Sequence, residues 1–337
     1  MRKSLLMVLV AVICLALLAS GCAPEAQEEA KPQAEEKAAE EAVAKYPERP
    51  IQLVIPYKPG GATDIIFRLV CKYAEKHLGQ PIVCVNMPGA TSTVGSRHVK
   101  EARPDGYTLL GSHDVIATAF YSGVVDYAFE AFEPICLITS TPNIATTHSD
   151  YPWNTMKELL EEAKSKPGEI VWSTTFGSTD HFFILGILEA AGVSKDVLRL
   201  VGYEGTGPQL TALLGKHTHG CMANVASAMG HVEAGDLKFL GVAWESRLPQ
   251  IPDVPTLKEQ GIDFAHATNR GVFAPKGTPE GILKKIEEAF RKAMEDPECK
   301  AKIEEMGTLV NFKPREEYVK FLDELMKKYD KLAQMMK

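Results

Sequence analysis

A glycine-rich turn between a strand-like and a helix-like segment is the part of this sequence that first suggests chemistry. The stretch IQLVIPYKPGGATDIIFRL spans residues 51–69 and places Gly60 and Gly61 directly before the helix pattern. The first-turn amides of a helix lack intrahelical partners and the helix dipole is positive there, so this end of a helix attracts anions. Two glycines let the backbone approach such an anion closely. The turn therefore predicts one wall of an anion-binding cleft.

Polar side chains beside this turn each allow two interpretations. Lys58 adds positive charge to the mouth of the cleft, or it is a solvated turn lysine. Asp64 at the helix start is explained by capping alone, yet beside an anion its charge would repel the ligand. Both roles are compatible if Asp64 or Thr63 caps the helix while its backbone N–H faces the cleft.

A second turn of this kind, TFGSTDH, occupies residues 175–181 between another strand pattern and another helix pattern. Ligands of open α/β sheets bind at the carboxyl ends of the strands. If each turn belongs to its own α/β domain and the two domains face each other, they form a cleft. Gly60 and Gly61 then lie on one wall of this cleft, and Gly177 and Ser178 lie on the other. His181 is equally well explained as a cleft residue or as an ordinary first-turn histidine.

Enzyme and metal motifs fit this sequence badly. It has no P-loop, no dinucleotide fingerprint and no nucleophile elbow. Ser112, His113 and Asp114 are consecutive, and adjacent strand residues point to opposite faces, so they cannot form a relay among themselves. His217 and His219 could offer two metal ligands, but no third ligand is apparent. We therefore expect no catalytic residue, no metal and no cofactor.

The N-terminus has the pattern of an export signal. Two basic residues precede an apolar run at residues 5–18, and the run leads into LASGC at residues 18–22. A run this short with these flanks is a signal peptide rather than a membrane span. The small residues before Cys22 match a lipoprotein cleavage box, although an ordinary signal peptide is the alternative. We expect a signal peptide at 1–21, a lipid on Cys22 and a flexible linker at 22–45, because that segment lacks aromatic residues.

Charge and cysteine content narrow the function further. The formal net charge of −7 makes the chain a poor nucleic-acid binder. Five cysteines remain once residues 14 and 22 are set aside, and they are widely spaced without a CxxC motif. They suggest neither a disulfide framework nor a zinc site, and most are expected to be buried as small apolar side chains.

Strand-like and helix-like segments alternate along the folded part. The expected strands are 51–55, 81–86, 107–112, 134–139, 144–148, 170–174, 198–201, 219–222 and 237–243, and the principal expected helices are 64–77, 93–102, 115–121, 155–165, 181–191, 279–294 and 315–335. This alternation predicts parallel sheets with helices on both faces. The strands are too many for one sheet, so we expect two α/β domains.

Five segments in order resemble a known family. They are YPERPIQLVIPYKPGGATDIIFRLV, NMPGATSTVGSRHVKEARPDGYTLLGS, YEGTGPQLTALLG, HVEAGDLKFLGVAWESRLPQIPDVPTLKEQG and RGVFAPKGTP. The chain resembles the substrate-binding receptors of tripartite tricarboxylate transporters, the TctC or Bug-type periplasmic binding proteins, from residue 46 to the C-terminus.

This resemblance implies an α/β fold of the two-domain periplasmic-binding-protein (Venus-flytrap) kind, with the ligand cleft between the domains. The first domain would comprise 46–139 and 244–337, and the second 140–243. The implied function is that of a lipid-anchored, monomeric receptor on the periplasmic or cell-surface side of the cytoplasmic membrane. It would capture a small carboxylate and pass it to the membrane permease subunits of the transporter.

The resemblance also implies which residues hold the ligand. One carboxylate would be held by backbone amides and waters at the first glycine turn, and further contacts would come from three other segments. The implied ligand-binding residues are Tyr57, Lys58, Gly60, Gly61, Ala62, Thr63, Asp64, Ser112, His113, Asp114, Gly177, Ser178, Thr179, Asp180 and Asn224. Aliphatic acids, aromatic acids and amino acids all remain open as ligands.

Other functions compete with this one. A sensor that presents its ligand to a membrane signalling protein would have the same receptor sequence. An extracellular hydrolase would need a nucleophile and base at a suitable spacing, which the sequence does not offer. A structural lipoprotein would bind no ligand, and the paired glycine turns count against it.

Overall fold

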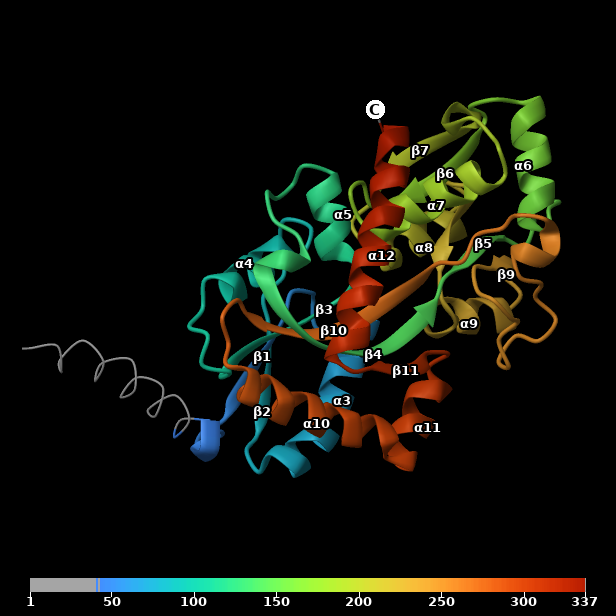
Figure 1. The fold of residues 1–337 in the computed structure, drawn as a ribbon. Helices are drawn as coiled ribbons and strands as arrows, with labels where there is room; N and C mark the ends of the chain where they lie inside the picture. The colour runs from blue at the N-terminus through green and yellow to red at the C-terminus, as the bar shows by residue number, and fades with distance from the viewer. Residues whose placement is uncertain (1–40, 42, 337) are drawn as a thin grey trace, which may run out of the picture. The chain divides into compact units, whose positions relative to one another are not determined.

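Two β-sheets organise the chain from Pro47 onward, which forms one unit (Figure 1). The structure is a computed structural model and describes residue 41 and residues 43–336. The expected signal peptide, Cys22 and nearly all of the expected linker lie outside the described residues. We call each sheet with the helices packed on it a lobe, and number the lobes in chain order.

Lobe 1 contains a sheet with the strand order β11-β4-β10-β3-β1-β2. Its strands are β1 (Ile51–Ile55), β2 (Ile82–Asn86), β3 (Thr108–Ser112), β4 (Phe132–Pro142), β10 (Ala267–Pro275) and β11 (Leu309–Lys313). Lobe 2 has the order β7-β6-β8-β5-β9. Its strands are β5 (Ile144–His148), β6 (Ile170–Thr174), β7 (Leu198–Gly202), β8 (Gly220–Ala223) and β9 (Leu237–Val242).

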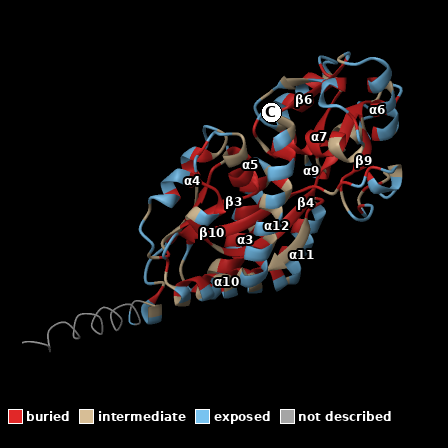
Figure 2. Ribbon diagram, turned by 45° about the horizontal axis from the view of Figure 1, so that its top comes forward, coloured by how far each residue is buried: buried red, intermediate tan, exposed pale blue. Residues whose placement is uncertain are grey.

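Helices cover both sheets. They are α3 (Ala62–Leu78), α4 (Thr93–Lys100), α5 (Val115–Tyr121), α6 (Met156–Ser165), α7 (Thr179–Ala190), α8 (Thr206–Leu214), α9 (Val225–Glu233), α10 (Glu280–Glu295), α11 (Pro297–Glu305) and α12 (Arg315–Ala333). Figure 2 shows the buried residues concentrated on the strands and on the helix faces that cover them. The elements expected from the sequence form within a few residues of their expected limits, and β10, β11 and α11 are additional.

The expectation of purely parallel sheets is wrong. Strands β1, β2 and β3 are parallel, as are β6, β7 and β8, but β10 is antiparallel to β3 and β4, and β5 is antiparallel to β8 and β9. Strands β4, β5, β9 and β10 lie next to the two crossings between the sheets, whereas β11, which is also antiparallel to β4, follows α11. A chain that leaves one sheet and enters another directly has no crossover helix to restore the parallel direction.

The two crossings lie side by side at one hinge. The chain first crosses at Asn143, between β4 and β5, and returns through the segment between β9 and β10. Three backbone hydrogen bonds join these segments: the Asn143 N–H donates to His266 O (3.1 Å), the Ala243 N–H to Asn143 O (2.9 Å) and the His266 N–H to Ala243 O (2.8 Å). The lobes are therefore connected by paired extended backbone.

Residues that follow β9 remain with lobe 2 before the chain returns. The Leu257 N–H donates to Val242 O at 2.8 Å, and Leu248 and Ile251 are buried in the same apolar cluster as Phe239 of β9. The domain limits expected from the sequence, at 139/140 and 243/244, stay predictions. The hydrogen bonding of this segment favours a later return to lobe 1 than residue 244.

Helix α12 contacts both lobes. Tyr121 at the end of α5 donates its hydroxyl to Met326 O at 2.9 Å, and Lys331 pairs with Glu189 of α7 at 2.6 Å. Tyr329 packs edge-on against Phe182 of α7, with ring centroids 5.1 Å apart. The C-terminal helix thus adds a third connection between the lobes, besides the two strand crossings.

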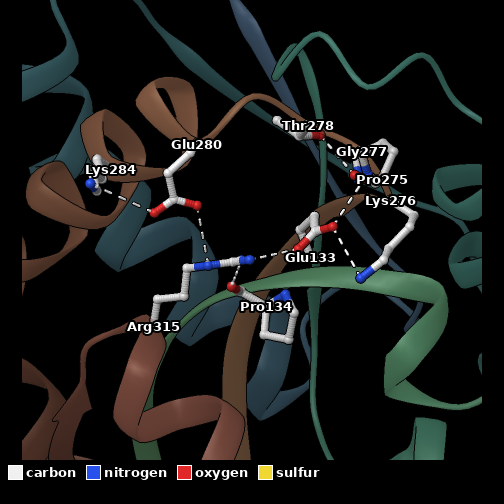
Figure 3. Close-up of polar contacts among 9 residues, drawn as sticks. All are labelled: Glu133, Pro134, Pro275, Lys276, Gly277, Thr278, Glu280, Lys284 and Arg315. Carbon is white, nitrogen blue, oxygen red and sulfur yellow. Dashed lines mark hydrogen bonds and ion pairs between the residues drawn. The ribbon is translucent and has the colours of Figure 1, made fainter.

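A polar cluster holds the start of α12 on the sheet of lobe 1 (Figure 3). Arg315 pairs with Glu133 at 2.7 Å and donates to Pro134 O at 2.6 Å, both on β4. Glu133 also pairs with Lys276 at 3.1 Å and accepts from the Gly277 N–H at 3.3 Å. Burial acts to raise the pKa of Glu133, but Arg315 and Lys276 hold it below its usual value. These bonds fix α12 to β4 and to the turn before α10.

Asp114 belongs to a buried polar network at the hinge. Its carboxylate accepts from Asn269 Nδ2 at 2.8 Å and from the Asn269 N–H at 3.3 Å, on the returning strand β10. Nearby, His266 Nδ1 lies 2.8 Å from Asn143 Oδ1. Burial raises the pKa of Asp114 to about 7, although the hydrogen bonds from Asn269 act in the opposite direction.

We expect this carboxyl to make stability depend on pH. Between about pH 4 and pH 7 the folded protein holds a proton on Asp114 that the unfolded chain has lost, so the free energy of unfolding falls as pH rises through that window, by on the order of 1 kcal/mol per pH unit. In Asp114→Asn this contribution is absent. Melting temperatures measured from pH 5 to pH 8 should fall less, or rise more, in Asp114→Asn than in the parent protein. Asp126→Asn, which alters an exposed residue beyond α5, serves as the control. Identical profiles for all three proteins would contradict the assignment.

Candidate functional site

A cleft of about 460 Å³ opens between the two lobes. The residues that line it from lobe 1 are Pro56, Tyr57, Lys58, Pro88, Gly89, Ala90, Thr91, Ser92, His113 and Val115, and those from lobe 2 are Thr175, Ser178, Thr179, Asp180, Glu204, Gly205, Thr206 and Met222. These residues follow or end β1, β2 and β3 on one side and β6, β7 and β8 on the other. The carboxyl edges of the two parallel strand sets therefore face each other across the cleft, as expected for ligand sites in α/β sheets.

Three helices begin at the walls of this cleft. The N-cap residues of α4, α7 and α8 are Ser92, Ser178 and Gly205, and all three line it. None of these three caps is closed by its own side chain. At α4 the first two N–H groups are already bonded, Thr93 to Ala90 O at 3.1 Å and Val94 to Gly89 O at 3.5 Å. At α7 and α8 the N–H groups of Thr179, Asp180, Thr206 and Gly207 make no hydrogen bond to any described residue and remain available to a ligand. The dipoles of all three helices favour a negative charge between them.

The wall formed by residues 88–92 has unusual backbone geometry. Ala90, Thr91 and Ser92 have φ values of 44°, 53° and 68°, in the left-handed region that non-glycine residues rarely occupy. The turn leads into α4, whose Gly95 lies against the end of β1: a Cβ there would meet Pro56 at 2.9 Å. This close packing brings the α4 N-terminus beside the loop that follows β1. Strained backbone of this kind is characteristic of ligand sites.

Tyr57 and His113 form a rigid aromatic surface in the lobe 1 wall. Their rings are stacked at 4.5 Å with an interplanar angle of 12°, and the Tyr57 hydroxyl lies 3.1 Å from Ser112 Oγ. His113 Nδ1 accepts from the Val115 N–H at 3.3 Å, which assigns the ring proton to Nε2. Burial holds the pKa of His113 well below its usual value, with a further contribution from Arg270. The ring is therefore a neutral donor at physiological pH.

Arg270 places a buried positive charge behind this wall. It is 2% exposed, donates from Nε to Thr63 Oγ1 at 3.0 Å and donates from Nη1 to Thr141 Oγ1 at 2.6 Å. Burial lowers its pKa to about 10, so the guanidinium stays charged at neutral pH. Among the described residues it forms no ion pair. Its partners are hydroxyl groups, which leave the charge to act on the potential of the lobe 1 wall.

Asp64 supports the first glycine turn and carries little free negative charge. Its carboxylate accepts from the Gly60 N–H (3.0 Å), from Arg68 Nε (2.9 Å) and from Asn86 Nδ2 (2.8 Å). Burial acts to raise its pKa, but these hydrogen bonds hold it below the usual value. The expectation that Thr63 or Asp64 caps this helix is wrong, because the N-cap of α3 is Gly61 and no side chain closes it. The repulsion expected between Asp64 and a nearby anion is offset locally, because the Arg68 cation and two N–H donors bind the carboxylate.

Asp180 has the same role on the lobe 2 wall. It accepts from the Thr175 N–H at 2.7 Å and from Gln209 Nε2 at 2.5 Å, and it bonds to the Ser178 hydroxyl. Thr175 Oγ1 in turn accepts from the Gly205 N–H at 3.0 Å. These contacts join the starts of α7 and α8 into one surface. Glu204 is exposed beside them and forms no ion pair with any described residue.

The residues implied by the family resemblance divide into two groups. Tyr57, Lys58, His113, Ser178, Thr179 and Asp180 line the cleft. The others, which lie outside its lining, are Gly60, Gly61, Ala62, Thr63, Asp64, Ser112, Asp114, Gly177 and Asn224. Among them, Ser112 contacts Tyr57, Asp114 lies at the hinge and Asn224 caps α9. The full ligand-binding set stays a prediction.

Two lining segments were not predicted from the sequence to be part of the site. They are residues 88–92 and residues 204–206. Each combines glycine with small polar residues between a strand and a helix, in PGATS and EGT, and this is the signal that identified the other two turns. A search for every strand–glycine–helix junction would have found them.

Metal and membrane features are not part of this site. No group of three or more His, Cys, Asp or Glu side chains in the described part of the chain is placed to hold a metal ion. His219 Nδ1 instead accepts from the Val171 N–H at 3.0 Å. Among the described residues, no helix has both the length and the apolar character needed to cross a bilayer.

Comparison with known proteins identifies the family. The model of the tripartite tricarboxylate transporter family receptor, TctC, matches residues 66–337. A UPF0065 protein in the gbd 5′ region of Cupriavidus necator is 32% identical over 292 residues, which are 84% of this chain and 86% of that protein. The curated relatives also include BugT from Bordetella pertussis, which is 28% identical over 256 residues, 74% of this chain and 78% of BugT.

Solved structures agree with this result. The periplasmic binding protein BugD superposes with a TM-score of 0.73 at 30% identity, over 86% of this chain and 97% of BugD. MatC from Rhodopseudomonas palustris, solved with bound malate, superposes with a TM-score of 0.75 at 28% identity, over 86% of this chain and all (100%) of MatC. The two-sheet α/β structure is that of periplasmic binding proteins, as expected from the sequence. The chain belongs to the TctC family of tripartite tricarboxylate transporter receptors, and it is a solute-binding receptor rather than an enzyme.

Proposed function

We propose that this receptor captures a small organic anion through a carboxylate group in the cleft between its lobes. The observation that carries the proposal is the convergence of the α4, α7 and α8 N-termini on that cleft. Backbone N–H groups can hold a carboxylate without a fixed counter-charge, so the ligand is bound specifically and still released. The malate bound to MatC, a relative with the same fold, supports this ligand class.

The charges of the two walls suggest how the ligand is oriented. Lobe 1 presents Lys58 at the cleft, the neutral donor His113, and the buried charge of Arg270 behind it. Lobe 2 presents Glu204 and the hydrogen-bonded carboxylate of Asp180. A carboxylate is therefore better stabilised against lobe 1, while lobe 2 supplies the amides of α7 and α8 to the other end of the ligand.

Closure of the lobes would complete the site. The hinge consists of extended backbone at Asn143, Ala243 and His266, and a few dihedral changes there can rotate one sheet edge toward the other. Excluding water would strengthen the amide–carboxylate hydrogen bonds, because the effective dielectric constant falls. Gly60, Gly61 and Asn224 lie outside the cleft lining and could reach the ligand in a closed form.

We further infer that the receptor serves uptake. A lipid on Cys22 and a linker at 22–45 would tether it on the periplasmic or cell-surface side of the cytoplasmic membrane, where it would deliver the ligand to the permease subunits of a tripartite tricarboxylate transporter. The support is the family membership and the N-terminal signal pattern. We expect the receptor to act as a monomer, with one ligand in the cleft.

The carboxylate proposal is tested by matched acid and amide ligands. Thermal unfolding of the intact protein should be measured with malate, other small dicarboxylates and monocarboxylates, and the corresponding amides. A ligand at 100 times its dissociation constant stabilises the fold by about 2.7 kcal/mol, which gives a readable increase in melting temperature. We expect an increase with at least one acid and none with its amide.

A ligand retained from expression would mask this increase, so the protein should first be unfolded, separated from small molecules and refolded. Mass analysis of the released material identifies any retained ligand. Equal stabilisation by an acid and its amide, or a retained ligand without a carboxylate, would contradict the proposal.

The orientation proposal is tested by charge-neutralising variants. Because both side chains are exposed, each effect should be modest, at up to about fivefold in dissociation constant. Lys58→Gln should weaken the binding of a dicarboxylate more than that of a monocarboxylate. Glu204→Gln should strengthen the binding of a dicarboxylate. Glu169→Gln, which alters an exposed residue at the opposite end of β6, is the matched control. Calorimetric titration that gave the same change for both ligand classes would remove these residues from the site.

A further inference from the structure

Two cysteines of lobe 1 face each other across the contact between α3 and β2. Cys71 is buried on α3, and Cys84 is partly exposed on β2, which is the edge strand of the sheet. They are free thiols in this structure. The helix packs on this strand, and hydrogen bonds on both sides of the pair fix how the two elements are aligned.

The alignment follows from residue spacing. Positions 64, 68, 71 and 75 form one stripe of α3, because residues three and four apart share a helix face. Positions 82, 84 and 86 share one face of β2. Asn86 Nδ2 donates to Asp64 Oδ1 at 2.8 Å, and Arg68 Nη2 donates to Asn86 Oδ1 at 2.6 Å.

At the other end of the stripe, the Ile82 N–H donates to Glu75 Oε2 at 3.3 Å. Cys71 lies between Arg68 and Glu75 on the helix stripe, and Cys84 lies between Ile82 and Asn86 on the strand. The two thiols are therefore held opposite each other by bonds on both sides.

The pKa values of the two thiols are shifted in opposite directions. The neighbouring Cys71 thiol is the main cause that lowers the pKa of Cys84, and Arg68 acts in the same direction against the effect of burial. Burial is the main cause that raises the pKa of Cys71. Cys84 is thus the more exposed thiol and the one more readily ionised. These are the properties of an attacking thiol, and Cys71 has those of a resolving thiol.

We propose that Cys71 and Cys84 form a reversible disulfide that fastens α3 to β2 when the protein meets a small-molecule disulfide. The Cys84 thiolate attacks the oxidant disulfide, forms a mixed disulfide and releases one thiolate. Cys71 then loses its proton and attacks Cys84 Sγ, which releases the second half of the oxidant as a thiol. Two cysteine thiols are oxidised by two electrons, and one oxidant disulfide is reduced to two thiols.

The position of this link connects it to the cleft. Helix α3 follows the loop that contains Tyr57 and Lys58, and β2 leads into the 88–92 turn. Both segments line the lobe 1 wall. A disulfide here would therefore join α3 and β2, the two elements next to the segments that line this wall. It would also close a short loop of chain between residues 71 and 84. It concerns the stability of lobe 1 and does not depend on the proposed ligand.

The test uses the intact protein with oxidised glutathione as the oxidant. After acid quenching, alkylation and digestion without reduction, mass spectrometry should find the Cys71 and Cys84 peptides joined, with the loss of two hydrogen atoms. Melting temperature should rise by several degrees on oxidation, since closing such a segment restrains the unfolded chain, and should return to its starting value with a reductant.

Matched variants separate this link from general oxidation. In Cys84→Ala the oxidant should no longer raise the melting temperature. Cys221→Ala, which alters a buried thiol on β8 of lobe 2, should keep the full oxidant-dependent rise. Reaction that stops at glutathione on Cys84, free thiols at both positions, or a cross-link between other cysteines would each overturn the proposal.

Discussion

The unpaired amides at the starts of α7 and α8, together with the N-terminal dipole of α4, are the constraint on which the rest of this molecule depends. In an isolated lobe these donors would face water, and only the pairing of two sheets at their carboxyl edges collects them around one cleft. The crossings at Asn143 and between β9 and β10 bring the edges together, and their mutual hydrogen bonds keep them side by side. Helix α12, anchored through Arg315 and Glu133, contacts both lobes and so limits how far they separate.

The charges around the cleft are arranged so that main-chain amides contribute most to the binding of an anion. The two aspartates at helix starts, Asp64 and Asp180, are each bound by several donors, which offsets their repulsion of an anion. His113 is kept neutral by burial and by Arg270, and Arg270 itself is held by hydroxyl groups rather than by a carboxylate. A site built in this way binds a carboxylate mainly through main-chain donors. This explains why its side chains indicate the ligand class more clearly than the individual ligand.

The sequence was most informative where local pattern decides structure. Strand and helix segments such as 51–55 and 115–121 follow from apolar periodicity and glycine punctuation, and these signals are local. The antiparallel strand β10 was missed because its sequence ATNRGVFAP is interrupted by Asn269, Arg270 and Gly271, and its burial comes from neighbours on β3 and β4 that are remote in sequence. Residues 88–92 and 204–206 line the cleft for a similar reason, because the ends of strands that are remote in sequence meet there. The hinge role of Asp114 could not be foreseen, because its partner Asn269 lies far along the chain.

The most direct measurement is a crystal structure of the receptor with the best-stabilising acid from the ligand screen. The account predicts a carboxylate between the lobes, with its oxygens within hydrogen-bonding distance of first-turn amides of α7 or α8, and with lobes closer together than in the structure described here. A carboxylate held mainly by side-chain cations, or a ligand bound outside the cleft lined by Tyr57, Ser92 and Ser178, would contradict it.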